Sequence, residues 1–221
     1  MMRRFFQRSG AQPMDHVQSV LLEMLANDRH SFDVATSSLL DGADPATVGA
    51  DLLTTDHKVN EGQRTIRREL MVHASVHGTS QVSAIMVYMS IVKDVERIGD
   101  YAKNIFDVAA QGGSLAGDDQ KELRDFRDRI SAMITEAAIA FADEDVTAAN
   151  ELIIEGDRMQ DVFDERVAAL VSTDRPGREA VPRALMYRYF KRIVGHLMNL
   201  LSAVVMPLDQ LDYYDEARAD R

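Results

Sequence analysis

Glu96, Asp100 and Asn104 recur every fourth residue within a long stretch of helical periodicity. Residues four apart lie on one face of a helix, so two carboxylates and a carboxamide form a single stripe. Like charges at this spacing repel, and the stripe therefore needs a positive partner: a nearby lysine or arginine, another chain or a bound cation. Gly99, between the carboxylates, costs about 1 kcal/mol relative to alanine inside a helix. We expect another backbone or a ligand to come close at this point.

Two segments carry a family resemblance. Residues 94–105 read DVERIGDYAKNI and resemble the signature helix of the PhoU family, whose pattern is roughly D-L-E-R-I-G-D-x-A-x-N-I, with Val95 in place of the usual leucine. The Asp-x-x-Val-Asn run of the preceding family helix is similar to Asp56–Asn60. The resemblance implies an all-α fold of two tandem three-helix bundles.

The same resemblance implies metal ligands. PhoU-type proteins bind clusters of iron or other metals through Glu/Asp-x-x-x-Asp pairs. Carried over to this chain, the pairs are Glu96 with Asp100, and Asp157 with Asp161. Asp56 and Asn60 supply further oxygen ligands on the helix before the first pair. Oxygen-rich sites accept Fe, Mn, Mg, Zn or Ca, so the residue types do not select one metal.

A role in phosphate homeostasis follows from the resemblance. It implies a non-enzymatic regulator of phosphate uptake that contacts a phosphate ABC transporter and a phosphate-sensing histidine kinase. It also implies a cytoplasmic homodimer that can associate with the inner face of the membrane. Two alternatives stay open: a metal-dependent sensor or store, and an accessory subunit of another ion transporter.

Composition limits the other classes of function. The chain has 221 residues, no cysteine and a net charge of −11. The absence of cysteine excludes disulfides and thiolate metal sites, and the negative charge opposes binding to nucleic acid. No apolar run reaches the ~20 residues that span a membrane. Neither a glycine-rich phosphate loop nor a nucleophile elbow is present, which argues against an enzyme.

Periodicity, proline and glycine predict six helices in two halves. The first three run over about 14–40, 45–72 and 80–111, with a turn at 73–79. The last three run over about 118–141, 146–171 and 179–205. We expect one bundle at 14–111 and a second at 118–206, with a leader at 1–13 and a tail at 207–221. Asp44 and Asp145 are the predicted N-caps of corresponding helices.

The second half repeats the first, but its acids differ. Aligning the N-caps places Asp157 and Asp161 at the positions of Asp56 and Asn60. When the last helices of the two halves are aligned on Arg97 and Arg192, Lys191 stands at the position of Glu96. Gly195 stands at the position of Asp100. The second half therefore offers carboxylates from one helix only. We expect Lys191, Arg192 and His196 to face them, with Lys191 forming a salt bridge in place of a metal.

Two further sets of residues can be explained by structure alone. Methionines at helical spacing are predicted to fill the core; they are Met86, Met89, Met133, Met186 and Met198. A basic cluster with interleaved aromatic rings lies in the last helix, at Arg183, Arg188, Lys191 and Arg192. This cluster suits an acidic partner or a lipid head group. Equally, its side chains can lie over the bundle and pair with acids on the preceding helix.

Overall fold

The computed structural model describes residues 11–113, 115–117 and 119–211. Six long helices make up most of this part of the chain, and no strand occurs among these residues. The elements are α2 (Ala11–Leu40), α3 (Pro45–His77), η1 (Gly78–Gln81), α4 (Val82–Ala110), α5 (Gln120–Ala142), α6 (Val146–Val171), α7 (Gly177–Val205) and η2 (Leu208–Gln210). The predicted all-α class is confirmed.

The predicted N-caps are present. The side chain of Asp44 accepts a hydrogen bond from the backbone N–H of Thr47, and Pro45 occupies the first helical position of α3. Asp145 accepts hydrogen bonds from the backbone N–H groups of Thr147 and Ala148 at the start of α6. Each cap satisfies donors that have no partner within the helix. The two halves therefore start their middle helix in the same way.

The predicted turn at 73–79 is wrong in its first part, because α3 continues to His77. His73, which an early turn would expose, is buried, and its ring is hydrogen-bonded to Gln81 in η1. Gly78 ends the helix with a φ of 59°, a conformation that glycine adopts without strain. The hairpin of α3 and α4 is therefore longer than the prediction.

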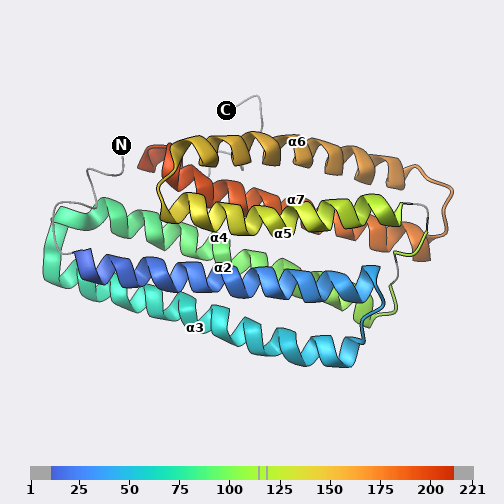
Figure 1. Ribbon diagram of the computed structural model, residues 1–221, viewed down its shortest axis with the longest axis horizontal. Coiled ribbons are helices and arrows are strands. Elements are labelled where there is room, and N and C mark those ends of the chain that lie inside the picture. Colours follow the sequence, from blue (N-terminus) through green and yellow to red (C-terminus); the bar gives the residue numbers. More distant parts are fainter. Residues whose placement is uncertain (1–10, 114, 118, 212–221) are drawn as a thin grey trace.

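The helices form two groups of three that lie side by side along their length (Figure 1). α2, α3 and α4 pack together, as do α5, α6 and α7, and the groups meet where α2 packs on α5 and α4 packs on α7. α3 and α6 lie on the outer sides. The described core residues form one continuous cluster, so the division into two domains stays a prediction. Residues 11–13 of the predicted leader belong to α2, and η2 lies in the predicted tail. Residues 1–10 and 212–221 lie outside the described part.

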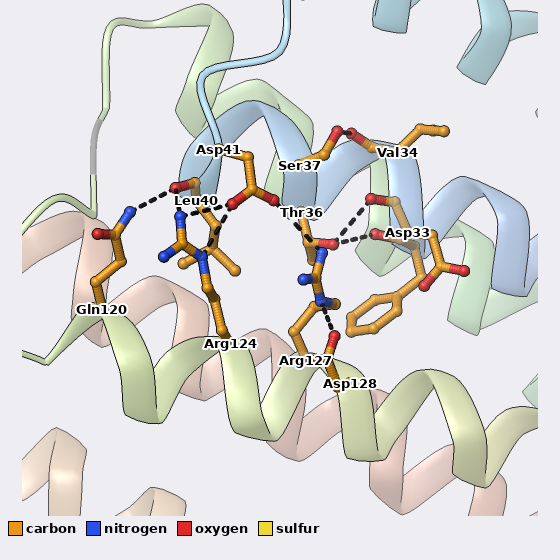
Figure 2. A network of polar contacts seen from close by, with 11 residues as sticks. Asp33, Val34, Thr36, Ser37, Leu40, Asp41, Gln120, Arg124, Arg127 and Asp128 are labelled. Atoms are coloured by element: carbon orange, nitrogen blue, oxygen red, sulfur yellow. Dashed lines mark hydrogen bonds and ion pairs between the residues drawn. The ribbon is translucent and has the colours of Figure 1, made fainter.

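One link between the groups lies at the end of α2. Figure 2 shows Arg124 of α5 reaching Asp41 and the backbone carbonyl of Leu40. The guanidinium donates to Asp41 Oδ1 at 2.7 Å and to the Leu40 carbonyl at 3.1 Å, and Gln120 donates to the same carbonyl at 2.6 Å. A cation at a helix C-terminus is favoured by the helix dipole. α5 thus satisfies a carbonyl that α2 leaves open.

A second link is buried between α4 and α7. One carboxylate oxygen of Asp94 lies 2.8 Å from His196 Nδ1 and accepts a hydrogen bond from Asn199 at 2.9 Å. Tyr101 stacks on the His196 ring, and Arg192 donates to the Tyr101 hydroxyl at 3.1 Å. Asp94 therefore holds the two groups of helices together.

We expect Asp94→Ala to lower the free energy of unfolding by about 2–4 kcal/mol, because it removes the carboxylate acceptor that the buried side chains of His196 and Asn199 share. Urea titration followed by circular dichroism measures the loss. Asp164→Ala is the matched control, since Asp164 is an exposed acid paired with Lys191 across α6 and α7. That change should cost about 1 kcal/mol or less. Equal costs for the two variants would contradict the structural role of Asp94.

Candidate functional site

An aspartate lies inside the core of the first three helices. Asp28, on α2, has an exposed fraction of 0%, and neither carboxylate oxygen has a hydrogen-bond partner. Its neighbours along the buried face of α2 are apolar, with Leu21 and Leu25 before it and Phe32 after it. A buried charge without a partner is costly. Such a group calls for a functional explanation.

The charges of three more carboxylates affect the pKa of Asp28. Burial is the largest influence and raises the pKa of Asp28 well above its usual value, followed by the charges of Glu96, Asp100 and Asp56. The nearby ammonium of Lys103 opposes this rise. We call Asp28, Asp56, Glu96 and Asp100 the carboxylate cluster; α2, α3 and α4 all contribute to it. The structure thus brings together the predicted residues Asp56, Glu96 and Asp100.

Lysine and arginine side chains partly neutralise the cluster. Lys103 Nζ lies 2.5 Å from Asp56 and 3.0 Å from Asp100. Although burial opposes the charge of Lys103, its hydrogen bonds to these two acids raise its pKa. Lys93 pairs with Glu96, and Arg97 lies 3.5 Å from Asp100. The positive partner that the stripe requires is thus present within the chain, chiefly as Lys103.

Gly99 makes room for the buried carboxylate. A Cβ atom at this position would lie 2.6 Å from Asp28 Oδ1 and 4.0 Å from the Val59 side chain. The first distance is shorter than any normal contact, so alanine would displace the carboxylate. A close approach does occur at Gly99, but its partner is a side chain of α2 and not the backbone or ligand that we expected.

The carboxylate cluster contains oxygen atoms of the kind that bind cations, but they are not arranged as the ligands of a metal site. No group of three His, Asp or Glu side chains in the described part of the chain is placed to bind a metal ion. Asn60 lies one turn beyond Asp56 and is half-buried, and none of the described hydrogen bonds joins it to the cluster. The unpartnered oxygens of Asp28 nevertheless fit a cation, because hard cations take carboxylate oxygens from several elements.

A groove opens beside the cluster. It has a volume of about 640 Å³ and lies between α3 and α4. Its lining includes the apolar side chains of Leu53 and Phe106 and the charged side chains of Arg97, Asp100 and Lys103. Two residues that act on Asp28 therefore border a solvent-filled space. Of the carboxylate cluster, Asp100 lines this groove.

The predicted second set lacks this arrangement. Asp157 is half-buried and Asp161 is exposed on α6. Lys191 pairs with Asp164, one turn further along α6, so the expected salt bridge forms with a different acid. The expectation that Arg192 and His196 face the α6 acids is wrong: both turn toward α4, where they contact Tyr101 and Asp94.

The basic cluster of the last helix is also largely internal. Arg183 is 1% exposed and donates to Asp119 at 2.7 Å and to the Ala116 carbonyl at 2.8 Å. Lys191 and Arg192 are engaged as described above. Of this cluster, Lys191 pairs with an acid of the preceding helix, as the structural alternative expected. Arg183 pairs instead with Asp119 at the N-cap of α5, and Arg192 contacts Tyr101. Arg188 is exposed.

The spacing of buried positions explains the difference between the halves. Buried residues of α2 follow the same intervals as buried residues of α5; the two rows are Leu21, Asp28, Phe32, Ala35 and Leu39, and Leu123, Ile130, Ile134, Ala137 and Phe141. Ile130 falls at the interval that Asp28 occupies, and none of the buried residues of α5 is an acid.

Sequence reasoning missed Asp28, although a signal was present. Helical spacing from Leu21 through Leu25 to Phe32 marks a core face, and Asp28 falls on it. An acid on a core face is rarely buried without a role. Asking which polar residues interrupt an apolar stripe would have identified it.

Comparison with known proteins places the site within a family. Residues 21–109 match the family model described as the PhoU domain. These residues are a PhoU domain. They include every member of the carboxylate cluster. The predicted resemblance to the PhoU family is confirmed for this part of the chain. A search of curated proteins finds no match.

Solved structures share the fold over most of the chain. PhoU from Pseudomonas aeruginosa is 23% identical, with a TM-score of 0.73, covering 87% of this chain and 95% of its own. The phosphate transport system regulatory protein PhoU from Streptococcus pneumoniae is 16% identical, with a TM-score of 0.69 and the same coverage. The PhoU domain at 21–109 is therefore followed by a second half that completes a PhoU-like fold.

Asp28→Asn is expected to stabilise the protein at about pH 8 by about 1 kcal/mol or more, because it removes an unpaired buried charge. The raised pKa of Asp28 sets the sign. Its contribution to stability is full below the pKa of the unfolded chain and is lost as the pH rises through the raised folded value. The gain should therefore shrink toward about pH 5, where Asp28 is more protonated. Thermal melting in chelator at both pH values measures it.

Asp33→Asn on the same helix is the control, since Asp33 is partly exposed and pairs only loosely with Arg29. It should show no comparable dependence on pH. A stabilisation by Asp28→Asn that is constant between the two pH values would show that Asp28 is not the titrating group.

Proposed function

We propose that the protein is a non-enzymatic regulator of phosphate uptake whose PhoU domain binds a cation at the carboxylate cluster. The regulatory part of the proposal is supported by the PhoU domain at 21–109 and by the fold shared with a phosphate transport system regulatory protein. The cation part is supported by one observation above all. Asp28 is fully buried among three other acids and has no hydrogen-bond partner.

The balance of charge favours an added cation. Lys103 is shared between Asp56 and Asp100, while the side chains of Lys93 and Arg97 are nearly half exposed. Asp28 is left unpaired. A divalent or iron ion held by Asp28, Asp56, Glu96 and Asp100 would supply the missing positive charge. Oxygen ligands of this kind suit Fe, Mn, Mg or Ca better than a thiolate-preferring metal, and Zn also accepts them.

Lys103 makes the protein stable without the metal. Its ammonium joins α3 to α4 across the cluster. A bound ion would compete with that ammonium for the same carboxylates, because like charges repel. Metal occupancy would then exchange one link between α3 and α4 for another. This exchange gives a regulator a physical means of reporting on its cation.

The proposed partners are the phosphate ABC transporter and a phosphate-sensing histidine kinase, contacted by helix surfaces of a cytoplasmic homodimer. The supporting observation is the extended outer surface of α3 and α6, since each packs on the rest of the protein along one side only. Long helices with one free side are suited to docking against other helices. A metal-dependent sensor or store is the second candidate, and the unpaired Asp28 favours it.

We expect Mn²⁺ or Mg²⁺ to raise the melting temperature of the metal-free protein, by about 2–4 °C for each kcal/mol of binding free energy. Glu96→Gln with Asp100→Asn should abolish this rise, because it removes two ligands of the cluster. Asp157→Asn with Asp161→Asn is the matched control in the second half and should leave the rise intact. A double cluster variant that is stabilised as much as the parent would place the site elsewhere.

Lys103→Gln tests the competition separately. Without the ammonium, the four acids repel one another in chelator, so the variant should melt below the parent. Added Mn²⁺ should then produce a larger rise than in the parent, since no internal cation opposes it.

Loss of the protein from the cells that make it is expected to increase phosphate uptake in phosphate-rich medium, because the proposed regulator restrains the transporter. Uptake of radiolabelled phosphate measures the effect, and restoring the parent gene is the control. Unchanged phosphate uptake together with altered transport of another ion would favour the accessory-subunit alternative.

A further inference from the structure

A long uncharged segment forms one end of the molecule. Residues 70–92 contain no Asp, Glu, Lys or Arg, in a chain of which 28% is charged. They comprise the last turns of α3, the turn η1 and the first turns of α4. This end of the hairpin, which we call the α3–α4 tip, projects beyond the neighbouring ends of α2, α5 and α7 (Figure 1).

Large apolar side chains are exposed around the tip. Met71, Val72 and Val76 on α3 are 60–69% exposed, and Val82, Met86 and Met89 on α4 are 41–53% exposed. The prediction that Met86 and Met89 fill the core is therefore wrong. On α4 the exposed positions follow the spacing i, i+4 and i+7, so they form a stripe along one face. Contiguous exposed apolar side chains of this size mark an interaction surface.

Basic residues lie behind the tip on both helices. Arg64, Arg67 and Arg68 precede the uncharged segment, and Lys93 follows it. The nearest acids on α3 are already engaged, since Glu61 pairs with Arg64 and Glu69 contacts His16. No described ion pair involves Arg68.

The distances along the helices match a lipid interface. At 1.5 Å per residue, the exposed apolar residues lie within about 10 Å of the turn, and the basic residues begin at about 12–16 Å. Peripheral proteins bury apolar side chains about 5–10 Å into the boundary between head groups and acyl chains. Basic side chains that lie slightly farther from the turn than these apolar residues would contact anionic head groups.

We propose that the α3–α4 tip inserts shallowly into a membrane surface that contains anionic lipid. None of the described helices is long and apolar enough to cross a membrane, so the contact is peripheral. A projecting, uncharged end suits a lipid surface better than a protein partner, because it has no charge pattern that would select one partner. This inference stands independently of the proposed cation site and regulatory role.

The first test is flotation of the full chain with protein-free vesicles of phosphatidylcholine containing about a quarter phosphatidylglycerol. The parent should float with these vesicles and bind pure phosphatidylcholine more weakly. Val76→Ser with Met86→Ser should weaken binding about tenfold or more, because less apolar surface enters the lipid. Arg68→Ser should weaken it about fivefold, and only for anionic vesicles.

The matched control alters two equally exposed apolar residues on the other side of the protein. Ile154 and Val171 lie on α6 and are 53% and 82% exposed, and α6 does not contribute to the tip. Ile154→Ser with Val171→Ser should bind vesicles as the parent does. All substituted positions are exposed, so the variants should fold, and circular dichroism verifies this.

A fluorescent probe locates the contact. The chain has no tryptophan, so Val76→Trp introduces a single reporter at the tip and Val171→Trp a single reporter on α6. On anionic vesicles the emission of the tip reporter should shift to the blue and be quenched by brominated lipids, while the α6 reporter should not respond.

Three results would overturn the proposal: no flotation of the parent, equal flotation of the Val76→Ser/Met86→Ser variant, or a response of the α6 reporter alone. Binding only to vesicles that carry membrane proteins would also overturn it and would assign the tip to a protein partner. None of these results would bear on cation binding, which is measured without lipid.

Discussion

A carboxylate buried between three helices constrains this protein more than any other single group. Asp28 has no hydrogen-bond partner, and the surrounding acids raise its pKa further than burial alone. The structure accommodates it by leaving out a side chain at Gly99 and by placing the ammonium of Lys103 between Asp56 and Asp100. α2, α3 and α4 are thus held at a spacing that suits the cluster as well as the apolar core.

The two halves reach similar folds by different means at the corresponding place. The buried residues of α5 include no acid, and apolar side chains such as Ile130 stabilise by burial and need no counter-charge. With no acid at the centre, the second half has no need of acids around it, and Lys191 pairs with a peripheral aspartate instead. Replacing a polar core group by apolar side chains is often neutral or stabilising. The presence of a buried, unpaired acid at position 28 is therefore not explained by stability.

The sequence predicted the positions of the helices better than it predicted the surroundings of individual side chains. The caps at Asp44 and Asp145 and the periodicity between them depend on local chemistry, and they located the helices to within a few residues. The α3 end was misplaced because the burial of His73 against Gln81 is a tertiary contact. Asp56, Glu96 and Asp100 could be grouped from spacing and family resemblance. Asp28 could not be grouped with them, because which face of α2 meets Gly99 depends on packing.

The cluster and the tip lie on the same pair of helices, and this arrangement joins the proposals physically. α3 and α4 are linked by Lys103 and Asp56, and the same helices continue to the exposed methionines and valines near η1. Helices are stiff, so a change in their separation at the cluster alters the separation at the tip. α4 is also fixed to α7 by Asp94, whereas the main contacts of α3 are with α2, α4 and η1. If the proposed cation binds, movement would therefore fall on α3, because that cation would replace the tie that Lys103 makes between α3 and α4.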